Sequence, residues 1–407
     1  MNETVDVLIV GAGPAGCAAA TRLHERGRSV LCVDRDFFPR FVVGESLLPR
    51  CNELLAEIGM LDAVAAQGYL VKSGAVFLRG VARERFSFAD SLDGDRGSAW
   101  QVPRDHFDQV LATETLARGV DLRFGHRVGD VRFDADGARA RVTDIGGDRS
   151  YDVAARFVLD ASGYGRVLPR LLDLERPALL PHRVSAFTHV QGDRRPSGAE
   201  EGDIWICVHP RGGWLWIIPF SNGRTSVGIV CDPELWESVE GTPRDRLFAL
   251  IAEEPNAQAR LRGATVVAPM RVMEGYSKKV SALHGERWAL VGNASDFLDP
   301  VFSSGVTLAL ETALLAANLT HRTLSGEAVD WSTEYDAVVG KAVGVFLAMI
   351  EGWYREDLQA VFFVPGKPDG LRRQITSLLG GHVLRPDNPF VEDPKGHLGR
   401  LVAQLRP

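Results

Sequence analysis

A glycine-rich turn near the amino end constrains the fold of this chain more than any other feature. Residues 5–10 (VDVLIV) predict a short buried strand, and residues 11–16 (GAGPAG) follow it at once. The first glycine allows the tight turn, the second lets a pyrophosphate approach the backbone, and the third lets the next helix pack closely on the strand. An alanine-rich stretch, residues 17–23, predicts that helix, whose amino end offers free N–H groups to phosphates.

A second predicted strand places an acidic residue where a nucleotide ribose would lie. Residues 29–33 (SVLCV) form this strand, which ends at Asp34, about 20 residues beyond the glycines. A glycine-rich turn alone is weak evidence, but here strand, glycines, helix, second strand and acidic residue all fall in register. The sequence therefore predicts a dinucleotide-binding α/β unit. This pattern fits FAD or NAD and does not separate them.

Two later segments repeat the pattern of an apolar strand that ends in a turn. The first is residues 157–163 (FVLDASG), and the second is residues 287–293 (RWALVGN). The second continues through residues 294–307 (ASDFLDPVFSSGVT). Both are predicted to return to the sheet that carries the glycine-rich turn.

An alanine- and leucine-rich helix is predicted over residues 308–320. Ser303 or Ser304 is a suitable N-cap for it. A helix that starts there would present N–H groups suited to negative charge on a reduced flavin ring. The simpler alternative is that Pro300 and Gly305 only shape a loop in front of a core helix.

Together these segments resemble the FAD-dependent aromatic hydroxylases related to p-hydroxybenzoate hydroxylase. More specifically, they resemble the group that contains geranylgeranyl reductases and flavin-dependent halogenases. Three further stretches carry the resemblance, residues 41–49 (FVVGESLLP), 100–108 (WQVPRDHFD) and 213–220 (GWLWIIPF). The similarity covers residues 1 to about 320 well and the remainder loosely. FAD is therefore the expected cofactor.

A looser likeness involves residues 292–305, 372–381 and 387–391. These are similar to the halogenase-like flavoproteins that oxidise a tryptophan side chain of a partner protein during cysteine tryptophylquinone formation. The resemblance thus extends the range of expected substrates from small molecules to aromatic groups borne by a peptide or protein.

The resemblance implies an α/β fold with a discontinuous Rossmann-type FAD-binding domain, a mixed β-sheet substrate domain and a small helical carboxy-terminal region. The FAD-binding domain would comprise residues 1–68, 101–180 and 276–325. The substrate domain would comprise 69–100 and 181–275, and the helical region 326–407. Alternating apolar residues in segments such as 204–208, 214–218 and 225–230 support the predicted sheet. With 407 residues, 45% of them hydrophobic, the chain is long enough for two or three domains.

The resemblance also implies which residues hold FAD. They are Gly11, Gly13, Ala15, Gly16, Asp34, Arg35, Ser46, Arg104, Asn293, Asp299 and Gly305. Arg104 would reach the phosphate or adenosine region, and residues 44–46 would lie near the flavin. Asn293 departs from the family, which usually has an aspartate there to bind the ribityl chain. An asparagine keeps one acceptor oxygen and adds a donor, so it can still bind a ribityl hydroxyl.

Four reactions share this scaffold: oxygen insertion, halogenation, dehydrogenation and double-bond reduction. Residues 214–219 (WLWIIP) match a Trp-x-Trp-x-Ile-Pro motif associated with halogenases, although halogenase-like hydroxylases carry it too. The simpler alternative is a sheet strand, because alternation alone would put both tryptophans on one face. Lys72 lies near the position of the halogenase lysine that relays the oxidised halogen. A desolvated lysine of lowered pKa could do this, whereas the simpler alternative is an exposed lysine at the start of a strand.

Chain length, a modest helical tail and the looser likeness favour hydroxylation. We expect an FAD-dependent monooxygenase that hydroxylates a phenol or indole, including a protein-borne tryptophan, through a flavin C4a-hydroperoxide, with O₂ as co-substrate. Lys72 and Glu45 are the candidate catalytic residues. For Glu45 a loop hydrogen bond is the simpler alternative, and for Asp299 a turn carboxylate before Pro300 is favoured. The alternatives are a flavin-dependent halogenase that uses Lys72, and a flavoprotein reductase or maturation-partner module.

Other features limit the partners and the location. No second glycine-rich loop marks an NAD(P)H domain, so reduction is expected from NAD(P)H or from a separate flavin reductase. A net charge of −7 argues against nucleic acid. There is no secretory signal pattern, and no run of ~18 apolar residues, so no transmembrane segment is expected. Five cysteines without a CxxC pair, and histidines without metal spacing, predict a cytoplasmic protein that binds no metal.

Overall fold

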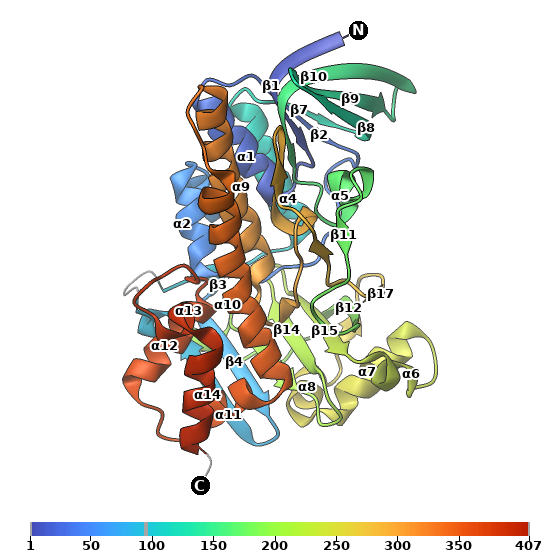
Figure 1. Cartoon of the computed structure of the whole chain (residues 1–407). Coiled ribbons are helices and arrows are strands. Elements are labelled where there is room, and N and C mark those ends of the chain that lie inside the picture. Colours follow the sequence, from blue (N-terminus) through green and yellow to red (C-terminus); the bar gives the residue numbers. More distant parts are fainter. Residues whose placement is uncertain (1, 93–96, 406–407) are drawn as a thin grey trace.

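The structure is a computed structural model that describes residues 2–92 and 97–405. Residue 1, residues 93–96 and residues 406 and 407, which fall in the predicted segments 1–68, 69–100 and 326–407, lie outside the described residues. Two sheets lie at opposite ends of the molecule, and the long helices α9 (Ser304–Leu324) and α10 (Ala337–Tyr354) run along one side (Figure 1). The predicted α/β class, with a mixed second sheet and a helical carboxy-terminal region, is confirmed.

The first sheet carries the glycine-rich turn. Its central strand β1 (Asn2–Val10) pairs in parallel with β2 (Val30–Asp34) and with β10 (Arg149–Asp160). Its further strands are β7 (Asp121–Phe124), β8 (His126–Asp134), β9 (Gly137–Asp144), β19 (His284–Gly285) and β20 (Trp288–Leu290). In β1 and β10 the residues next to the turn, 7–10 and 157–160, are buried, and so is all of β2, which explains the apolar runs there.

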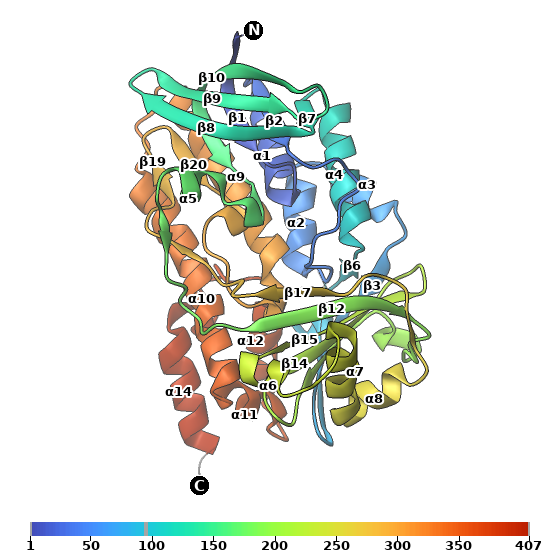
Figure 2. The same ribbon diagram turned by 90° about the vertical axis from the view of Figure 1, so that its right-hand side faces the viewer.

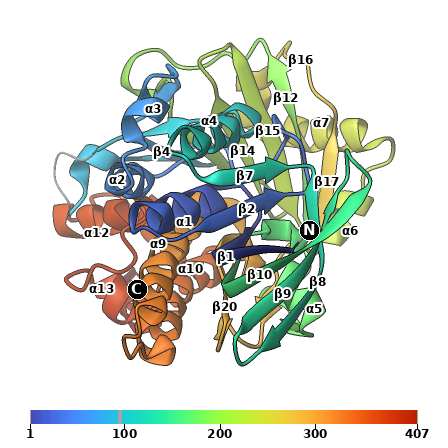
Figure 3. The same cartoon turned by 90° about the horizontal axis from the view of Figure 1, so that it is seen from above.

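The two faces of this sheet are covered differently. Helices α1 (Pro14–Glu25), α4 (Arg104–Ala117) and α9 cover one face. The antiparallel strands β8 and β9 fold over the other, so that α1 and β8–β9 lie on opposite sides of β1 (Figure 3). Strands of this sheet therefore come from well-separated parts of the chain, although the exact boundaries of the three predicted FAD-binding segments stay a prediction.

The second sheet is mixed, because β13 pairs in parallel with β4 and all its other pairs are antiparallel. Its strands are β4 (Gly74–Arg79), β5 (Ala82–Ser87), β12 (Val184–Gln191), β13 (Ile204–Val208), β14 (Trp214–Pro219), β15 (Arg224–Cys231), β16 (Thr265–Val266) and β17 (Arg271–Glu274). Two short ribbons complete the strands, β3 (Leu70–Lys72) with β6 (Ala99–Gln101) and β11 (Glu175–Arg176) with β18 (Lys279–Val280).

Side chains of β14 alternate between the two faces of this sheet. Leu215 and Ile217 pack with the helices α6 (Pro233–Glu237), α7 (Pro243–Glu253) and α8 (Pro255–Leu261), which cover the outer face (Figure 2). Trp214, Trp216 and Ile218 point the other way and join the core that faces the carboxy-terminal helices. The two motif tryptophans therefore share one face.

The remaining helices complete the layers. They are α2 (Pro49–Glu57), α3 (Leu61–Ala65), α5 (Val167–Leu171), α11 (Asp357–Phe363), α12 (Asp369–Leu379), α13 (Pro389–Glu392) and α14 (Pro394–Leu405). The last four pack with α10 against the second sheet through a core rich in aromatic rings, including Phe77, Trp353 and Phe362.

One helical stretch, Ser332–Tyr354, is long and apolar enough to cross a membrane by length and composition, with a mean hydropathy of 1.4. The sequence predicted none, because Lys341 and Glu351 interrupt the apolar run. In the structure 56% of its apolar window is buried inside the protein, where Phe346 and Met349 pack in the second core. Burial in this core accounts for the apolar composition of the helix.

The start of α9 differs from the prediction. The helix runs from Ser304 to Leu324, longer than the predicted 308–320. Ser303 stands at the N-cap position in a left-handed conformation (φ 56°), and its side chain makes no capping hydrogen bond. The predicted position of the N-cap is confirmed, but Ser303 does not cap through its side chain, because that bond needs the extended backbone that Ser303 lacks. Asp299 instead caps the short turn before the helix by accepting from the Val301 N–H at 3.1 Å.

All five cysteines are buried free thiols. Burial raises the pKa of Cys17 to about 12, so this thiol stays protonated at neutral pH. Among the described residues, no group of three or more His, Cys, Asp or Glu side chains is placed to hold a metal ion. The cysteines are therefore packing residues in this fold.

Candidate active site

A cavity of about 860 Å³ lies between the two sheets. The glycine-rich turn and the start of α9 form one wall, and the inner face of the second sheet forms the other. The predicted site residues that line it are Gly11, Gly13, Ala15, Asp34, Arg35, Glu45, Ser46, Arg104, Asn293, Asp299 and Gly305. Gly16 and Lys72 are not part of the lining. The structure thus brings most of the predicted residues together, although the role of each stays a prediction.

The three glycines of the turn have different surroundings. Gly11 has a φ of +102°, and a Cβ atom there would come within 2.5 Å of the Ala161 carbonyl oxygen. A Cβ atom on Gly16 would overlap the Gly11 carbonyl oxygen, which shows how closely α1 packs on the turn. At Gly13 a Cβ atom would meet only the Arg40 guanidinium, at 3.3 Å, so this backbone is open toward the cavity. The turn is therefore shaped to receive a phosphate group.

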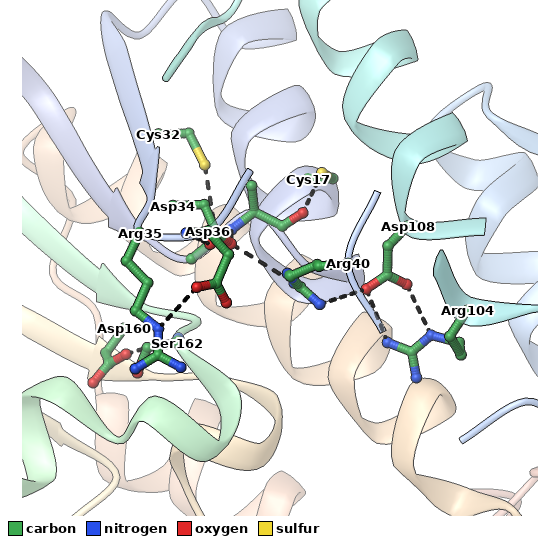
Figure 4. Close-up of polar contacts among 12 residues, drawn as sticks. Cys17, Cys32, Asp34, Arg35, Asp36, Arg40, Arg104, Asp108, Asp160 and Ser162 are labelled. Atoms are coloured by element: carbon green, nitrogen blue, oxygen red, sulfur yellow. Dashed lines mark hydrogen bonds and ion pairs between the residues drawn. The ribbon is translucent and has the colours of Figure 1, made fainter. Parts of the chain in front are cut away.

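Asp34 stands at the end of β2 and is buried. Its carboxylate accepts hydrogen bonds from the backbone N–H groups of Ala12, at 2.8 Å, and Asp36, at 2.9 Å (Figure 4). Each carboxylate oxygen keeps a further lone pair, so a ribose hydroxyl can still donate to it. The Arg35 side chain is mostly exposed and pairs with Asp36 at 3.3 Å.

Arg104 lines the cavity and also links two segments of the chain through buried contacts. Its guanidinium makes a two-point ion pair with buried Asp108, at 2.8 and 3.1 Å, and donates to the carbonyl oxygens of Val43 and Gly44. Arg40 reaches the same carboxylate at 3.2 Å and lies 3.7 Å from Asp34 (Figure 4). Arg104 thus ties the loop before Glu45 to α4, which the sequence analysis did not foresee, although the i,i+4 spacing of Arg104 and Asp108 signals such a pair.

Glu45 makes a buried contact that the sequence analysis missed. Its Oε1 lies 2.8 Å from His189 Nε2, and His189 comes from β12 in the second sheet. The rings of Phe41 and Phe220 flank the imidazole at 5.8 and 5.4 Å. This pair fixes the loop that carries Glu45 against the second sheet. The contact is visible only in the folded structure, where β12 lies next to this loop, because 144 residues separate the two partners in the sequence.

Ser46 is the next residue along this loop. Its Oγ is buried, and among the described residues it has no hydrogen-bond partner. A buried hydroxyl normally finds a partner, since leaving it without one costs free energy. Ser46 lines the cavity, but its Oγ is shielded, so the side chain would have to turn for this hydroxyl to meet a bound group.

Lys72 is buried, not exposed, so the simpler alternative from the sequence is wrong. Its Nζ donates to the Leu47 carbonyl oxygen at 2.9 Å and lies 5.3 Å from the centre of the Phe88 ring. Burial lowers the pKa of Lys72 to about 7, and the buried Asp203 carboxylate opposes this only in part. Leu47 follows the cavity-lining residues Glu45 and Ser46 in the chain, so this hydrogen bond links Lys72 to the same loop.

Asp299 does more than the turn role favoured from the sequence. Besides capping the turn, its Oδ2 accepts hydrogen bonds from the hydroxyls of Tyr276, at 2.9 Å, and Tyr354, at 2.7 Å. Burial raises the pKa of Asp299, while the two tyrosine hydroxyls oppose the rise. Neither tyrosine stood out in the sequence.

The residues of the first wall fit FAD. An open glycine backbone and the amino end of α1 face one end of the cavity, where a pyrophosphate would lie. Asp34 can accept from a ribose, and the Gly305 backbone at the start of α9 is open, with only Phe297 near a Cβ atom placed there. Asn293 and Ser46 are further polar residues along the same wall.

Comparison with known proteins agrees with this geometry. The model of a family described as "FAD binding domain" matches residues 4–336. A solved flavoprotein/dehydrogenase from Cytophaga hutchinsonii is 41% identical, with 99% of each chain covered and a TM-score of 0.96. A 1H-pyrrole-2-carbonyl-[peptidyl-carrier protein] brominase from Pseudoalteromonas luteoviolacea is 29% identical over 93% of this chain and 92% of its own. A tryptophan 2-halogenase from Chondromyces crocatus is 31% identical over 80% of this chain and 63% of its own.

Proposed function

Because the chain belongs to the FAD-binding domain family, and within it to the FAD-dependent halogenase-like group, we propose that it is a flavin-dependent halogenase. It would place chlorine or bromine on an electron-rich aromatic ring, with Lys72 as the residue that receives the oxidised halogen. Halogenation replaces the hydroxylation expected from the sequence as the first hypothesis, because several curated relatives are named as halogenases.

The burial of Lys72 is the observation that carries this proposal. With a pKa of about 7, a large fraction of the amine is neutral at physiological pH, and only the neutral amine has the lone pair needed to take up an electrophilic halogen. The Leu47 carbonyl oxygen fixes the direction of the amine. Apolar surroundings, including the Phe88 ring, keep water from competing.

FAD, reduced by NAD(P)H or by a separate flavin reductase, would supply the activation of O₂ and the oxidation of the halide. The protein's own residues bind this cofactor along the first wall and exclude water from the cavity. The oxidised halogen would then pass the Glu45–Ser46 part of the wall to reach Lys72. Glu45, fixed by His189, stands at that place and is the second residue proposed to act in the reaction.

The second wall suits a flat aromatic substrate. It presents Phe187, Trp214, Trp216 and Ile218, and Phe41 comes from the opposite loop. Aromatic rings favour edge-on and offset contacts with another ring. One named relative acts on a pyrrole held by a peptidyl carrier protein and another on tryptophan. We therefore infer a pyrrole, indole or phenol substrate, either free or attached to a carrier or protein.

Mass spectrometry of the products tests this function. The holoenzyme with a flavin reductase, NADH, O₂ and chloride or bromide is offered pyrrole, indole and phenol, free and as pyrrole-2-carbonyl-carrier protein. A halide-dependent product with the isotope pattern of chlorine or bromine is expected. Lys72→Ala should lower its formation about 100-fold or more while flavin binding stays intact.

Lys367→Ala is the matched control. Lys367 is also a buried lysine, and its Nζ also donates to a backbone carbonyl, that of Phe362 at 2.8 Å, but it lies outside the cavity. Equal loss in both variants, or a product without halogen, would show that the proposal is wrong.

Hydroxylation is the second candidate, and the position of Lys72 favours it. The amine lies behind the cavity wall and does not line the cavity. A reaction that inserts oxygen directly into a ring held next to the flavin would not need this lysine. Products that gain oxygen mass without halide, at an unchanged rate in Lys72→Ala, would establish this alternative.

A further inference from the structure

A buried carboxylate in the cavity wall has one oxygen without a hydrogen-bond donor among the described residues. Glu45 is 2% exposed, and its Oε1 accepts from His189 Nε2 at 2.8 Å. Its Oε2 has no such partner, yet it is not one of the fully shielded atoms, as Ser46 Oγ is. Glu45 lines the cavity, so the exposed side of Oε2 is its cavity side. Because buried polar atoms normally have partners, a donor on a bound molecule is expected here.

The Glu45 carboxylate is held in place from two directions. The backbone carbonyl of Glu45 accepts from the Val102 N–H at 2.8 Å. On the other side, the His189 ring lies between the rings of Phe41 and Phe220, at 5.8 and 5.4 Å. A carboxylate can only accept, so His189 presents its Nε2 proton to Oε1. His189 is thus a positioning residue for Glu45, and Oε2 keeps a fixed direction with lone pairs for a further donor.

A continuous row of aromatic rings leads along the second wall to this carboxylate. Neighbouring ring centres are 5.8 Å apart between Trp214 and Trp216, 5.7 Å between Trp216 and Phe187, and 6.0 Å between Phe187 and Phe41. The next ring is that of His189, 5.8 Å from Phe41. The four rings before His189 belong to residues that line the cavity. A flat ring that packs on the end of this row therefore has the carboxylate at one edge.

We propose that Glu45 is a specificity-determining residue, which accepts a hydrogen bond from the ring N–H or O–H of the substrate. The substrate is then a pyrrole, an indole or a phenol whose N–H or O–H is free, and a ring without this donor is rejected. A site that leaves a buried polar group unpaired discriminates strongly against such an analogue. This inference rests on the proposed function for the class of ring, and it gives Glu45 its part in the reaction.

The same hydrogen bond would also help the substitution. When an electrophile adds to the ring, positive charge spreads onto the ring nitrogen or the phenol oxygen and makes its proton more acidic. A hydrogen bond from this proton to a carboxylate is therefore stronger in the transition state than in the bound substrate. Because the effect depends on charge, a neutral amide in place of the carboxylate would hold the ring more weakly.

The first test measures binding and needs no turnover. Oxidised, FAD-loaded protein is titrated by calorimetry with indole and with benzofuran, a ring system of the same size that lacks the donor. Pyrrole with furan, and phenol with fluorobenzene, complete the set of pairs. In at least one pair the wild type should bind the donor ring about 10-fold more tightly or better. Glu45→Gln should reduce this preference several-fold, because an amide oxygen accepts more weakly than a carboxylate.

Two further variants separate recognition from folding. Glu45→Leu/His189→Leu removes both buried partners together, so no unpaired polar group remains, and it should bind both rings of each pair equally. Glu254→Gln is the matched control, since Glu254 is also buried and its Oε2 accepts from the Ala257 N–H at 2.7 Å, but it does not line the cavity. It should lower Tm and leave the preference for the donor ring unchanged.

The positioning role of His189 has a test of its own. His189→Gln keeps a side-chain N–H that can donate to Glu45 Oε1, so the preference for the donor ring should survive. His189→Leu removes this donor, and the preference should fall. Equal preferences in these two variants would show that His189 does not position the carboxylate. A variant that only perturbs the fold would weaken the binding of both rings alike.

The second test uses the product assay with an equal mixture of both rings of one pair. The ratio of the two halogenated products also reflects the intrinsic reactivity of the rings, so it is compared between variants. Glu45→Gln should lower the share of the donor ring about 10-fold. Glu254→Gln should leave the ratio at its wild-type value. An unchanged ratio in Glu45→Gln would overturn the inference.

The two tests also separate this inference from the proposed function. If no halogenated product forms but the wild type prefers the donor ring and Glu45→Gln loses that preference, the proposed reaction is wrong and recognition by Glu45 stands. If halogenated product forms but the wild type binds both rings of every pair equally, or binds none of them, the reaction stands and recognition by Glu45 is wrong.

Discussion

The two walls of the cavity are built by different means. The nucleotide wall is mainly backbone: the glycine turn and the start of α9 present main-chain groups in a fixed arrangement, and Asp34 at the end of β2 adds a carboxylate. The opposite wall, the inner face of the second sheet, is made of side chains such as Phe187, Trp214 and Trp216. Pairs such as Glu45 with His189 and Asp299 with Tyr354 hold distant segments together beside it. A backbone wall suits a cofactor common to a whole family, whereas a side-chain wall changes with single substitutions.

This difference teaches where specificity can arise. Substituting a residue of the nucleotide wall should affect FAD binding and hence every reaction. Substituting a residue of the second wall should leave the flavin bound and change the chemistry. Variants that violate this division would show that the two walls are coupled.

The largest effect is expected from Gly16→Val. A side chain here would collide with the Gly11 carbonyl oxygen, so α1 could not keep its place on the turn. We expect protein without bound flavin, measured by the visible absorbance of the purified sample. Gly340→Ala, on an open face of α10, is the control and should retain full flavin content. A yellow Gly16→Val protein would contradict the close packing described here.

Arg104→Met should have the next largest effect. Asp108 would keep only the weaker Arg40 contact at 3.2 Å, and removing one partner of a buried ion pair typically costs about 3–5 kcal/mol. The free energy of unfolding, measured in urea, should fall by that order, and FAD should bind more weakly because the Val43–Gly44 loop loses its anchor. Arg132→Met, in an exposed pair with Asp130, should change neither.

The difference between the two walls also explains which site residues could be predicted from the sequence. The nucleotide wall could be predicted from the sequence, because the glycines, the strand and Asp34 lie within one short stretch of the chain. Each of these features has a local physical reason for its position. Lys72 could be placed only by resemblance, because its burial depends on Leu47 and Phe88 meeting it in space. Tyr354 carries no local signal at all, since its role arises only when the end of α10 reaches Asp299.

The titration of Lys72 should make folding stability depend on pH, which is a smaller and more specific effect. Its pKa is lowered from 10.5 to about 7 in the folded protein, so between these values the unfolded chain binds a proton that the folded chain does not. Stability should therefore rise with pH across this window, at up to about 1.4 kcal/mol for each pKa unit. Lys72→Met should remove this slope and raise Tm near pH 7, and under the proposed function it should also abolish halogenation.

The same titration predicts the pH profile of the reaction. If the neutral amine takes up the halogen, product formation should rise with pH through about 7 and then level off. Flavin reduction measured separately should not follow this curve. A flat product profile between pH 6 and pH 8 would contradict a role for the neutral amine.

The smallest effect separates ligand binding from folding stability at two buried serines, Ser46 in the cavity lining and Ser226 in β15 of the second sheet. Ser46 Oγ has no partner among the described residues, whereas Ser226 Oγ accepts from the Trp216 indole N–H at 3.1 Å. Ser46→Ala should leave the free energy of unfolding nearly unchanged without ligand, yet weaken FAD or substrate binding several-fold, because one hydrogen bond is worth about 1 kcal/mol. Ser226→Ala should do the reverse, destabilising the protein by a similar amount with flavin affinity intact. Both changes remove one buried hydroxyl. Denaturant unfolding and flavin titration of the two variants therefore show whether the Ser46 hydroxyl contributes to ligand binding and not to folding stability. Equal losses of stability would mean that it is not.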